Sequence, residues 1–320
     1  MTRKIANDKI LIGVIIVGII VLVKFETRKM SIPINADDSG ISITDEEDEK
    51  GLQAAKDKFH GCMIKAAKIY YNESTKFFEE FAKCIKKHIG IGVSEMDNFS
   101  NYFFGEKKMF LPMKDADDDC KWLTIGIGGV AYAEELFLKK YPQCSVFGAD
   151  PADTGNFSKI GQLRPFGVGI EDTNIDLTVM INGSYTKKVM KVVSLTNLLD
   201  DLVKTRFVHY LTIDIEGFEY IILRELVGNG KFAHSDVVFC QIDAELHHPK
   251  FPKAHSSIKK LNAVQFMLDF LQVSSPYIPV FNVPYLRHPH QKVTFVNVVD
   301  PRCKRAFKPQ SYFGKNKNNL

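Results

Sequence analysis

Short apolar runs alternate with helical patterns along much of the chain, and this alternation limits the fold more than any other feature. The apolar runs are residues 122–127, 145–149, 210–215 and 237–242, and the helical patterns are residues 130–141, 218–226 and 258–271. Strands that alternate with helices form a mostly parallel sheet covered by helices. Two more strand-like runs, 277–283 and 292–299, follow with no helix between them. We therefore expect the last strand to return antiparallel.

The composition supports a globular chain with one sizeable core. Hydrophobic residues make up 45% of the 320 residues and charged residues 25%, which excludes fibrous, collagen-like and wholly disordered chains. The net charge of +4 is too small to indicate a nucleic-acid partner, and we expect none.

An unbroken apolar run near the N-terminus indicates a membrane segment. Residues 10–23 are all apolar and lie between Lys9 and Lys24. As a helix the run spans about 21 Å, which is short of the roughly 30 Å hydrocarbon layer but suits a thinner membrane. No small residues follow Val23 at the positions that a signal peptidase reads. An uncleaved signal anchor is favoured over a cleaved signal peptide or a buried core helix.

Sequons and cysteines favour the secretory pathway (ER/Golgi), with a lumenal C-terminal domain. The glycosylation sequons, more than chance supplies, are Asn72, Asn98, Asn156 and Asn182. Six cysteines suit an oxidising compartment, but six cysteines allow fifteen pairings. None has metal-ligand spacing, and the strand positions of Cys144 and Cys240 favour buried apolar thiols.

The chain divides into five segments by composition and pattern. They are an N-terminal anchor at 1–29, an acidic stem that needs no fold at 30–50, a helical extension at 51–110, an α/β domain at 111–302 and a basic flexible tail at 303–320. In the extension, apolar residues recur at helical spacing and predict two amphipathic helices that cap the α/β domain.

A glycine-rich turn follows the first predicted strand of the α/β domain. Residues 122–131 read W-L-T-I-G-I-G-G-V-A. Gly126 and Gly128 would let backbone amides at a helix N-terminus approach a nucleotide or an amino-acid carboxylate, although a plain tight turn is the alternative. Asp150 ends the next strand, where an acid accepts ribose hydroxyls. Together these signals predict an adenosine-type cofactor.

Two cofactor classes share this geometry. The spacing of Gly126, Gly128 and Ala131 also matches the dinucleotide fingerprint of NAD-binding proteins. A reversed last strand favours S-adenosylmethionine, because NAD-binding sheets usually end in parallel strands.

Acidic residues gather at the ends of two later strands. Asp214, Glu216 and Glu219 lie at or just after the end of the strand-like run 210–215, and Glu245 and His247 follow the next one. Because parallel strands present their carboxyl ends at one edge, Glu245 and His247 should lie beside Asp214 as a base-and-carboxylate group. Helix capping by Asp214 and a plain pair of surface histidines are the alternatives.

Over residues 120–299 the chain resembles the FkbM-type family of S-adenosylmethionine-dependent methyltransferases. The resemblance rests on W-L-T-I-G-I-G-G, V-F-G-A-D-P, Y-L-T-I-D-I-E-G-F-E and Q-I-D-A-E-L-H. The anchored arrangement is similar to that of membrane-bound animal members of the family. The resemblance implies a class I methyltransferase fold, with a mostly parallel seven-stranded sheet, and O-methylation of sugars or other hydroxyl compounds. Thr124 stands where an acid commonly opens the first glycine motif, and a threonine cannot pair by charge with the methionine ammonium.

We therefore predict a lumen-facing, single-pass O-methyltransferase whose acceptor is a small molecule or glycan with a hydroxyl group, such as a glycan or glycolipid. The predicted cofactor-binding residues are Thr124, Gly126, Gly128 and Asp150. The predicted catalytic residues are Asp214, Glu216 and His247, with His247 or Asp214 as the base, and the predicted substrate-binding residues are Glu219 and Glu245. A divalent cation such as Mg²⁺ or Ca²⁺ among the carboxylates is left open. A Golgi-type glycosyltransferase and a catalytically silent binding protein are the alternatives.

Overall fold

The computed structural model describes residues 43–101, 106–115, 119–152, 154–181, 184–285 and 289–313. The expected anchor at residues 1–29, most of the stem, the sequon at Asn182 and residues 314–320 of the tail lie outside the described residues. Among the helices described, none has both the length and the apolar composition that crossing a membrane requires.

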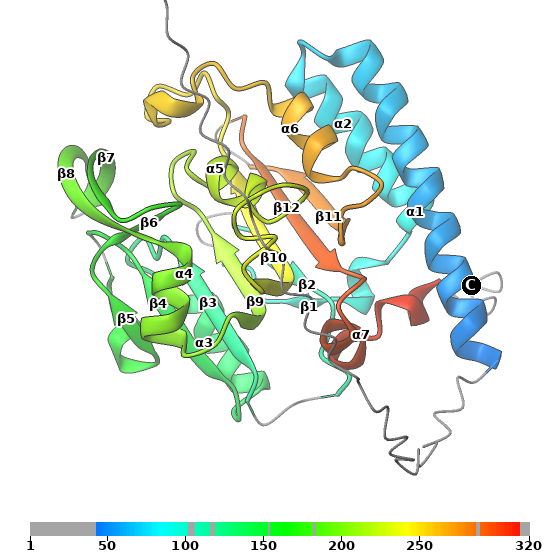
Figure 1. The fold of residues 1–320 in the computed structure, drawn as a ribbon, viewed down its shortest axis with the longest axis horizontal. Coiled ribbons are helices and arrows are strands. Elements are labelled where there is room, and N and C mark those ends of the chain that lie inside the picture. The colour runs from blue at the N-terminus through cyan, green and yellow to red at the C-terminus, as the bar shows by residue number, and fades with distance from the viewer. Residues whose placement is uncertain are drawn as a thin grey trace, which may run out of the picture. The chain divides into compact units, whose positions relative to one another are not determined.

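A seven-stranded sheet forms the centre of the fold, in the order β11-β12-β10-β9-β3-β4-β5 (Figure 1). Its strands are β3 Lys121–Ile125, β4 Ser145–Ala149, β5 Gln162–Arg164, β9 Phe207–Ile213, β10 Val238–Leu246, β11 Tyr277–Pro284 and β12 Gln291–Asn297. Strands β5, β4, β3, β9 and β10 pair in parallel, whereas β12 runs antiparallel to both β10 and β11. The mostly parallel sheet with a reversed last strand is therefore confirmed.

Helices cover both faces of this sheet. They are α1 Ile43–Tyr70, α2 Ser74–Cys84, α3 Tyr132–Lys140, α4 Leu195–Leu198, α5 Glu219–Arg224, α6 Ala263–Phe270 and α7 Pro301–Phe307. Shorter helical turns lie at Ile85–Ile89, Val93–Glu95, Phe157–Lys159, Leu199–Val203, Ser256–Ile258 and Pro309–Tyr312. Leu123 and Ile125 of β3 pack with residues of α1, α2, α5 and α6, whereas Trp122 packs with α3 and α7 on the other face. The two predicted amphipathic helices are α1 and α2, which lie with α6 beside β11 (Figure 1).

A smaller sheet is inserted between β5 and β9. It contains β6 Gly167–Gly169, β7 Thr173–Ile181 and β8 Ser184–Ser194, in the order β6-β8-β7, and a separate pair joins β1 Asp97–Asn98 to β2 Met109–Phe110. Strands β7 and β8 form a long antiparallel hairpin. The sequence did not predict this hairpin, because most of β8 is exposed and lacks the apolar alternation of a half-buried strand.

The structure corrects two predictions of unfolded segments. Helix α1 begins at Ile43, inside the predicted stem, and Asp45 and Glu46 lie in its first turn, where acidic residues favour a helix. In the predicted flexible tail, α7 continues to Phe307, which is fully buried. The Asp300 side chain accepts a hydrogen bond from the backbone N–H of Arg302 and so caps α7.

All six cysteines form disulfide bonds, which pair Cys62 with Cys84, Cys120 with Cys144, and Cys240 with Cys303. The bonds join α1 to α2, the start of β3 to the start of β4, and β10 to α7. The expectation that Cys144 and Cys240 are free buried thiols was wrong, because each has a partner that is distant in sequence.

Candidate functional site

A cavity of about 340 Å³ lies where the parallel strands β3, β4, β9 and β10 end. Ligands of open α/β sheets bind at this edge, and the volume lies within the usual range of ligand sites, roughly 300 to 1,000 Å³. Seven of the nine predicted site residues line the cavity, and they are Thr124, Gly126, Gly128, Asp150, Asp214, Glu216 and Glu245. The other two, His247 and Glu219, lie outside its described lining. The structure therefore brings the predicted cofactor residues and three of the predicted acceptor-side carboxylates to one cavity.

The glycine-rich loop needs its glycines for conformation and for space. Gly126 has a φ of +87° and Gly128 a φ of +62°, values that residues with a Cβ rarely adopt. A Cβ at Gly126 would overlap the carbonyl oxygen of Asp214. The loop therefore runs directly against the end of β9, and its backbone faces the cavity.

Asp150 holds this loop in place. Its Oδ2 accepts hydrogen bonds from the backbone N–H groups of Ile127 at 2.8 Å and Gly128 at 3.1 Å, and its Oδ1 accepts one from Ala152 at 2.8 Å. Charge-assisted bonds of this kind are stronger than neutral ones. The carboxylate at the end of β4 thus shapes the loop as well as lining the cavity.

Thr124 belongs to a buried hydrogen-bond network that ends on a carboxylate. Its Oγ1 donates to Glu134 Oε1 at 2.6 Å and accepts from Trp122 Nε1 at 2.9 Å and from Thr212 Oγ1 at 3.0 Å. Glu134 lies in the first turn of α3, is 2% exposed and lines the cavity. A carboxylate therefore lies next to Thr124, although β3 itself carries none at that position.

Glu134 was missed by the sequence interpretation, which treated α3 only as a helical pattern. Burial raises the pKa of its carboxyl group, and nearby Lys108 acts in the opposite direction. The available signal was the spacing to Phe137, because residues three apart lie on one helix face. Phe137 is fully buried, so the helix that buries it also turns Glu134 inward.

His247 lies at the centre of the predicted acidic group. Its Nε2 is 3.4 Å from Glu216 Oε2, 3.7 Å from Asp214 Oδ1 and 3.8 Å from Glu245 Oε1. Burial lowers the pKa of His247, but Glu219 and Asp214 outweigh this effect and raise it to about 10. Burial, together with Glu245, raises the pKa of Asp214 well above its usual value. The predicted juxtaposition of these side chains is therefore present.

Glu219 occupies a different place from the acceptor-facing one that we predicted. It is fully buried and lies behind His247, outside the described lining of the cavity. Its Oε1 accepts a hydrogen bond from the backbone N–H of His247 and contacts His247 Nδ1 at 3.1 Å, and its Oε2 accepts one from the N–H of Gly217. Glu219 thus orients the imidazole ring and does not face the cavity.

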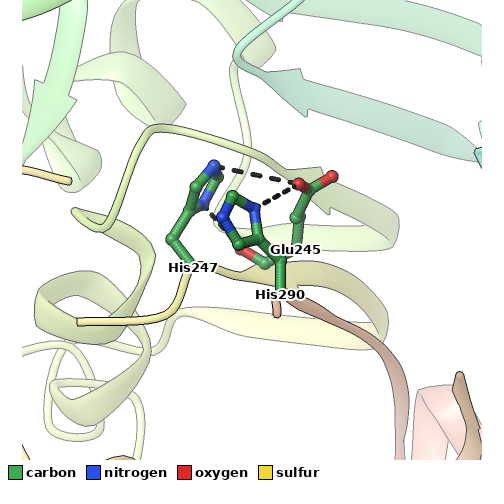
Figure 2. A group of neighbouring side chains, drawn as sticks. All are labelled: Glu245, His247 and His290. Carbon is green, nitrogen blue, oxygen red and sulfur yellow. Dashed lines mark hydrogen bonds and ion pairs between the residues drawn. The ribbon is translucent and has the colours of Figure 1, made fainter. Parts of the chain in front are cut away.

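Two residues near β12 complete this group and were not predicted. Lys292 Nζ lies 2.7 Å from Glu245 Oε2 and 3.7 Å from Asp214 Oδ2. His290 Nδ1 lies 3.0 Å from Glu245 Oε1, and Figure 2 shows that Glu245, His247 and His290 point toward one another. The pairing of Leu246 with Gln291 across β10 and β12 explains this meeting, because the next opposed positions are 247 and 290.

The comparison with known families gives one decisive match. The Methyltransferase FkbM domain matches residues 85–274, which is more than half of the chain. The chain belongs to the FkbM methyltransferase family. No curated protein matches the sequence. The family resemblance is thus confirmed, while the membrane-anchored branch remains a prediction.

The residues of this FkbM domain fit S-adenosylmethionine, the methyl donor that a methyltransferase family implies. The fit rests on the cavity beside the glycine loop, whose backbone runs close to Asp214 because Gly126 carries no Cβ, and on two carboxylates. Asp150 lies at the strand end that contacts ribose in such sheets, and buried Glu134 offers a negative charge beside Thr124. These groups match the ribose and the ammonium of that cofactor.

Proposed function

We propose that this FkbM domain methylates a hydroxyl group, with a glycan or glycolipid of the secretory pathway as acceptor. The observation that carries the proposal is the composition of one cavity. Its lining joins the glycine loop and Asp150, on one side, to Asp214, Glu216 and Glu245 on the other. Such a cavity brings a nucleotide-type cofactor next to groups that handle an acceptor proton.

In this proposal Glu134 supplies the charge that Thr124 lacks. Gly126 and Gly128 would approach the methionine part of the cofactor, Asp150 would contact the ribose, and Glu134 would pair with the ammonium group. A buried carboxylate is costly without a partner of opposite charge. The hydroxyl of Thr124, which donates to Glu134, would hold this carboxylate in position. A threonine at position 124, where the family commonly has an acid, is thus compatible with cofactor binding.

Asp214 is the better candidate for the base that takes the acceptor proton. It lines the cavity, and burial raises its pKa, which brings a carboxylate closer to the pKa of an effective base at neutral pH. Without a bound cation, His247 would already hold a proton there, because Glu219 and Asp214 raise its pKa to about 10. Bound S-adenosylmethionine would supply the methyl group, and the domain would supply position and the base.

The test is a calorimetric titration of the full chain with S-adenosylmethionine, S-adenosylhomocysteine, NAD and UDP-sugars. Binding of the first two, followed by release of S-adenosylhomocysteine with a member of a glycan and glycolipid panel, would support the proposal. Binding of a UDP-sugar instead would select the glycosyltransferase alternative. Binding of S-adenosylmethionine without turnover on any acceptor would favour a silent binding protein.

We also propose that the chain is a single-pass membrane glycoprotein with a lumenal domain. The apolar residues 10–23 support an anchor, and three disulfide bonds suit an oxidising compartment. The sequon residues Asn72, Asn98 and Asn156 are exposed. Translation with microsomes should give alkali-resistant membrane association and a glycosidase-sensitive mass shift. A soluble, unglycosylated product would contradict the proposal.

A further inference from the structure

The side chains that surround His247 are arranged like the ligands of a metal ion. Glu245, His247 and His290 are buried, and each offers one ligand atom within 4.8 Å of the others. Two of them come from the end of β10 and the residue that follows it, and His290 comes from the residue before β12. The antiparallel return of β12 therefore assembles the group (Figure 2).

The distances around His247 Nε2 suit coordination better than hydrogen bonding. Glu216 Oε2 and Glu245 Oε1 lie 3.4 and 3.8 Å from this nitrogen, whereas N–H···O bonds measure about 2.7 to 3.2 Å. Ligand atoms about 2.1 Å from a divalent metal are separated by about 3.0 Å in an octahedron and about 3.4 Å in a tetrahedron. A small contraction would therefore bring Glu245 Oε1 and His247 Nε2 onto one ion, together with the nitrogen of His290 that belongs to the same group.

Glu216 has an oxygen aimed at this point and strain in its backbone. Its Oε2, the carboxylate atom nearest to His247 Nε2, is buried and makes no hydrogen bond. Its φ is +55°, which is uncommon for a residue with a Cβ and unfavourable for the backbone. Such strain is retained where the surrounding structure requires one position for a side chain.

Two further groups orient the ligands from outside. Glu219 contacts Nδ1 of His247 at 3.1 Å, which leaves Nε2 directed at the cluster, as carboxylate partners do for metal-bound histidines. Lys292 contacts Glu245 Oε2 at 2.7 Å, and it is Oε1 of Glu245 that faces the two histidines. The ligand atoms thus already have their orientation.

The charge of the group also calls for a cation. Four carboxylates lie within 4 Å of the His247 ring nitrogens, and they are Asp214, Glu216, Glu219 and Glu245. Lys292 contacts two of them. The carboxylates outnumber the lysine that contacts them, and a buried excess of carboxylates either retains protons or exchanges them for a cation.

We propose that Glu245, His247 and His290 bind one divalent transition-metal ion, of the class of Mn²⁺, Fe²⁺ or Zn²⁺. Imidazole ligands favour Fe²⁺ and Zn²⁺, and Mn²⁺ also accepts the carboxylate oxygen, whereas Mg²⁺ and Ca²⁺ favour oxygen ligands alone. Because Glu245 lines the cavity, the ion borders it. Its role rests on the proposed function, in which it would hold an acceptor oxygen and lower the pKa of its hydroxyl group.

The test uses the full chain, without a histidine tag, stripped by a chelator and titrated with Mn²⁺, Zn²⁺ and Mg²⁺. We expect one equivalent of Mn²⁺ or Zn²⁺ and much weaker Mg²⁺ binding. His247→Gln and His290→Gln should each lower the affinity at least tenfold, and Glu219→Gln about 10- to 100-fold. The matched control is His234→Gln, because His234 is exposed and should leave binding unchanged.

A second measurement needs no variant. Pulsed electron paramagnetic resonance of the Mn²⁺-loaded chain should show coupling to two imidazole nitrogens. Absence of that coupling, equal binding of Mg²⁺, or unchanged affinity in folded His247→Gln would overturn the site. Metal binding by a chain that binds no S-adenosylmethionine would refute the proposed function alone, and the reverse result would refute the metal site alone.

Discussion

Replacing Asp150 by asparagine should damage both the stability of the domain and its affinity for the cofactor. Aspartate accepts three backbone hydrogen bonds, from Ile127, Gly128 and Ala152, and the amide NH₂ of asparagine must take the place of one oxygen. At least one of these bonds is then lost, which costs about 1.5 to 3 kcal/mol for a charged acceptor. A loss of about 2 kcal/mol lowers the Tm of a domain of this size by roughly 4 to 8 °C.

Thermal unfolding and calorimetric titration of Asp150→Asn measure the two effects separately. We expect the affinity for S-adenosylmethionine to fall at least tenfold, because the loop that approaches the cofactor is no longer held. Asp201→Asn is the matched control, since Asp201 is exposed and the change in charge is the same. An unchanged Tm would show that the three bonds do not stabilise the loop, and full affinity in a destabilised variant would refute the cofactor assignment at β4.

Three further predictions concern other parts of the molecule. Glu134→Gln should weaken S-adenosylmethionine binding about tenfold and leave methylthioadenosine, which lacks the ammonium, unchanged in calorimetry; equal losses for both would refute the ammonium contact. Replacing both Cys240 and Cys303 by alanine removes a disulfide bond between residues that are 63 positions apart in sequence. The gain in chain entropy of the unfolded state should lower the free energy of unfolding by about 4 kcal/mol, measured by urea denaturation. A decrease of less than about 1 kcal/mol would contradict this prediction. Burial opposes ionisation of Glu106, but Lys108 and Lys292 outweigh this effect and lower the pKa of Glu106 to about 2. The charge of Glu106 therefore stabilises the fold fully above about pH 4.5, and this stabilisation is lost as the pH falls toward 2. The difference in Tm between the wild type and Glu106→Gln should become smaller as the pH falls from about 4.5 toward 2. A constant difference would show that the ion pairs of Glu106 do not stabilise the fold.

The order of segments was enough to predict the sheet and the edge at which the site lies. The missing helix before β12 predicted the reversed strand, and the acids after β9 and β10 fell at the carboxyl edge because parallel strands present that edge together. Such patterns depend only on local spacing. They therefore predicted that Asp214 and His247 belong to the site, but they gave no contact distances.

The remaining features depend on contacts between distant segments. Lys292 lies in an apolar run where a lysine is not expected, and its buried ammonium group contacts Glu245, Glu106 and Asp214, which come from other segments of the chain. His290 meets His247 through the register of β10 and β12, which no local pattern contains. The pairing of the cysteines has the same origin, since fifteen arrangements satisfy the sequence equally.

The walls of the cavity come from two parts of the fold, the central sheet and the smaller inserted sheet. Leu177, Val179 and Tyr185 line it from the β7–β8 hairpin, whereas the acidic groups stand on the central sheet. A hairpin whose strands pair mainly with each other tolerates changes in length and side chains without disturbing the strands that carry the charges. Under the proposed function, related proteins could therefore differ in this hairpin and accept other acceptors. The acidic residues at the ends of the central strands would stay the same.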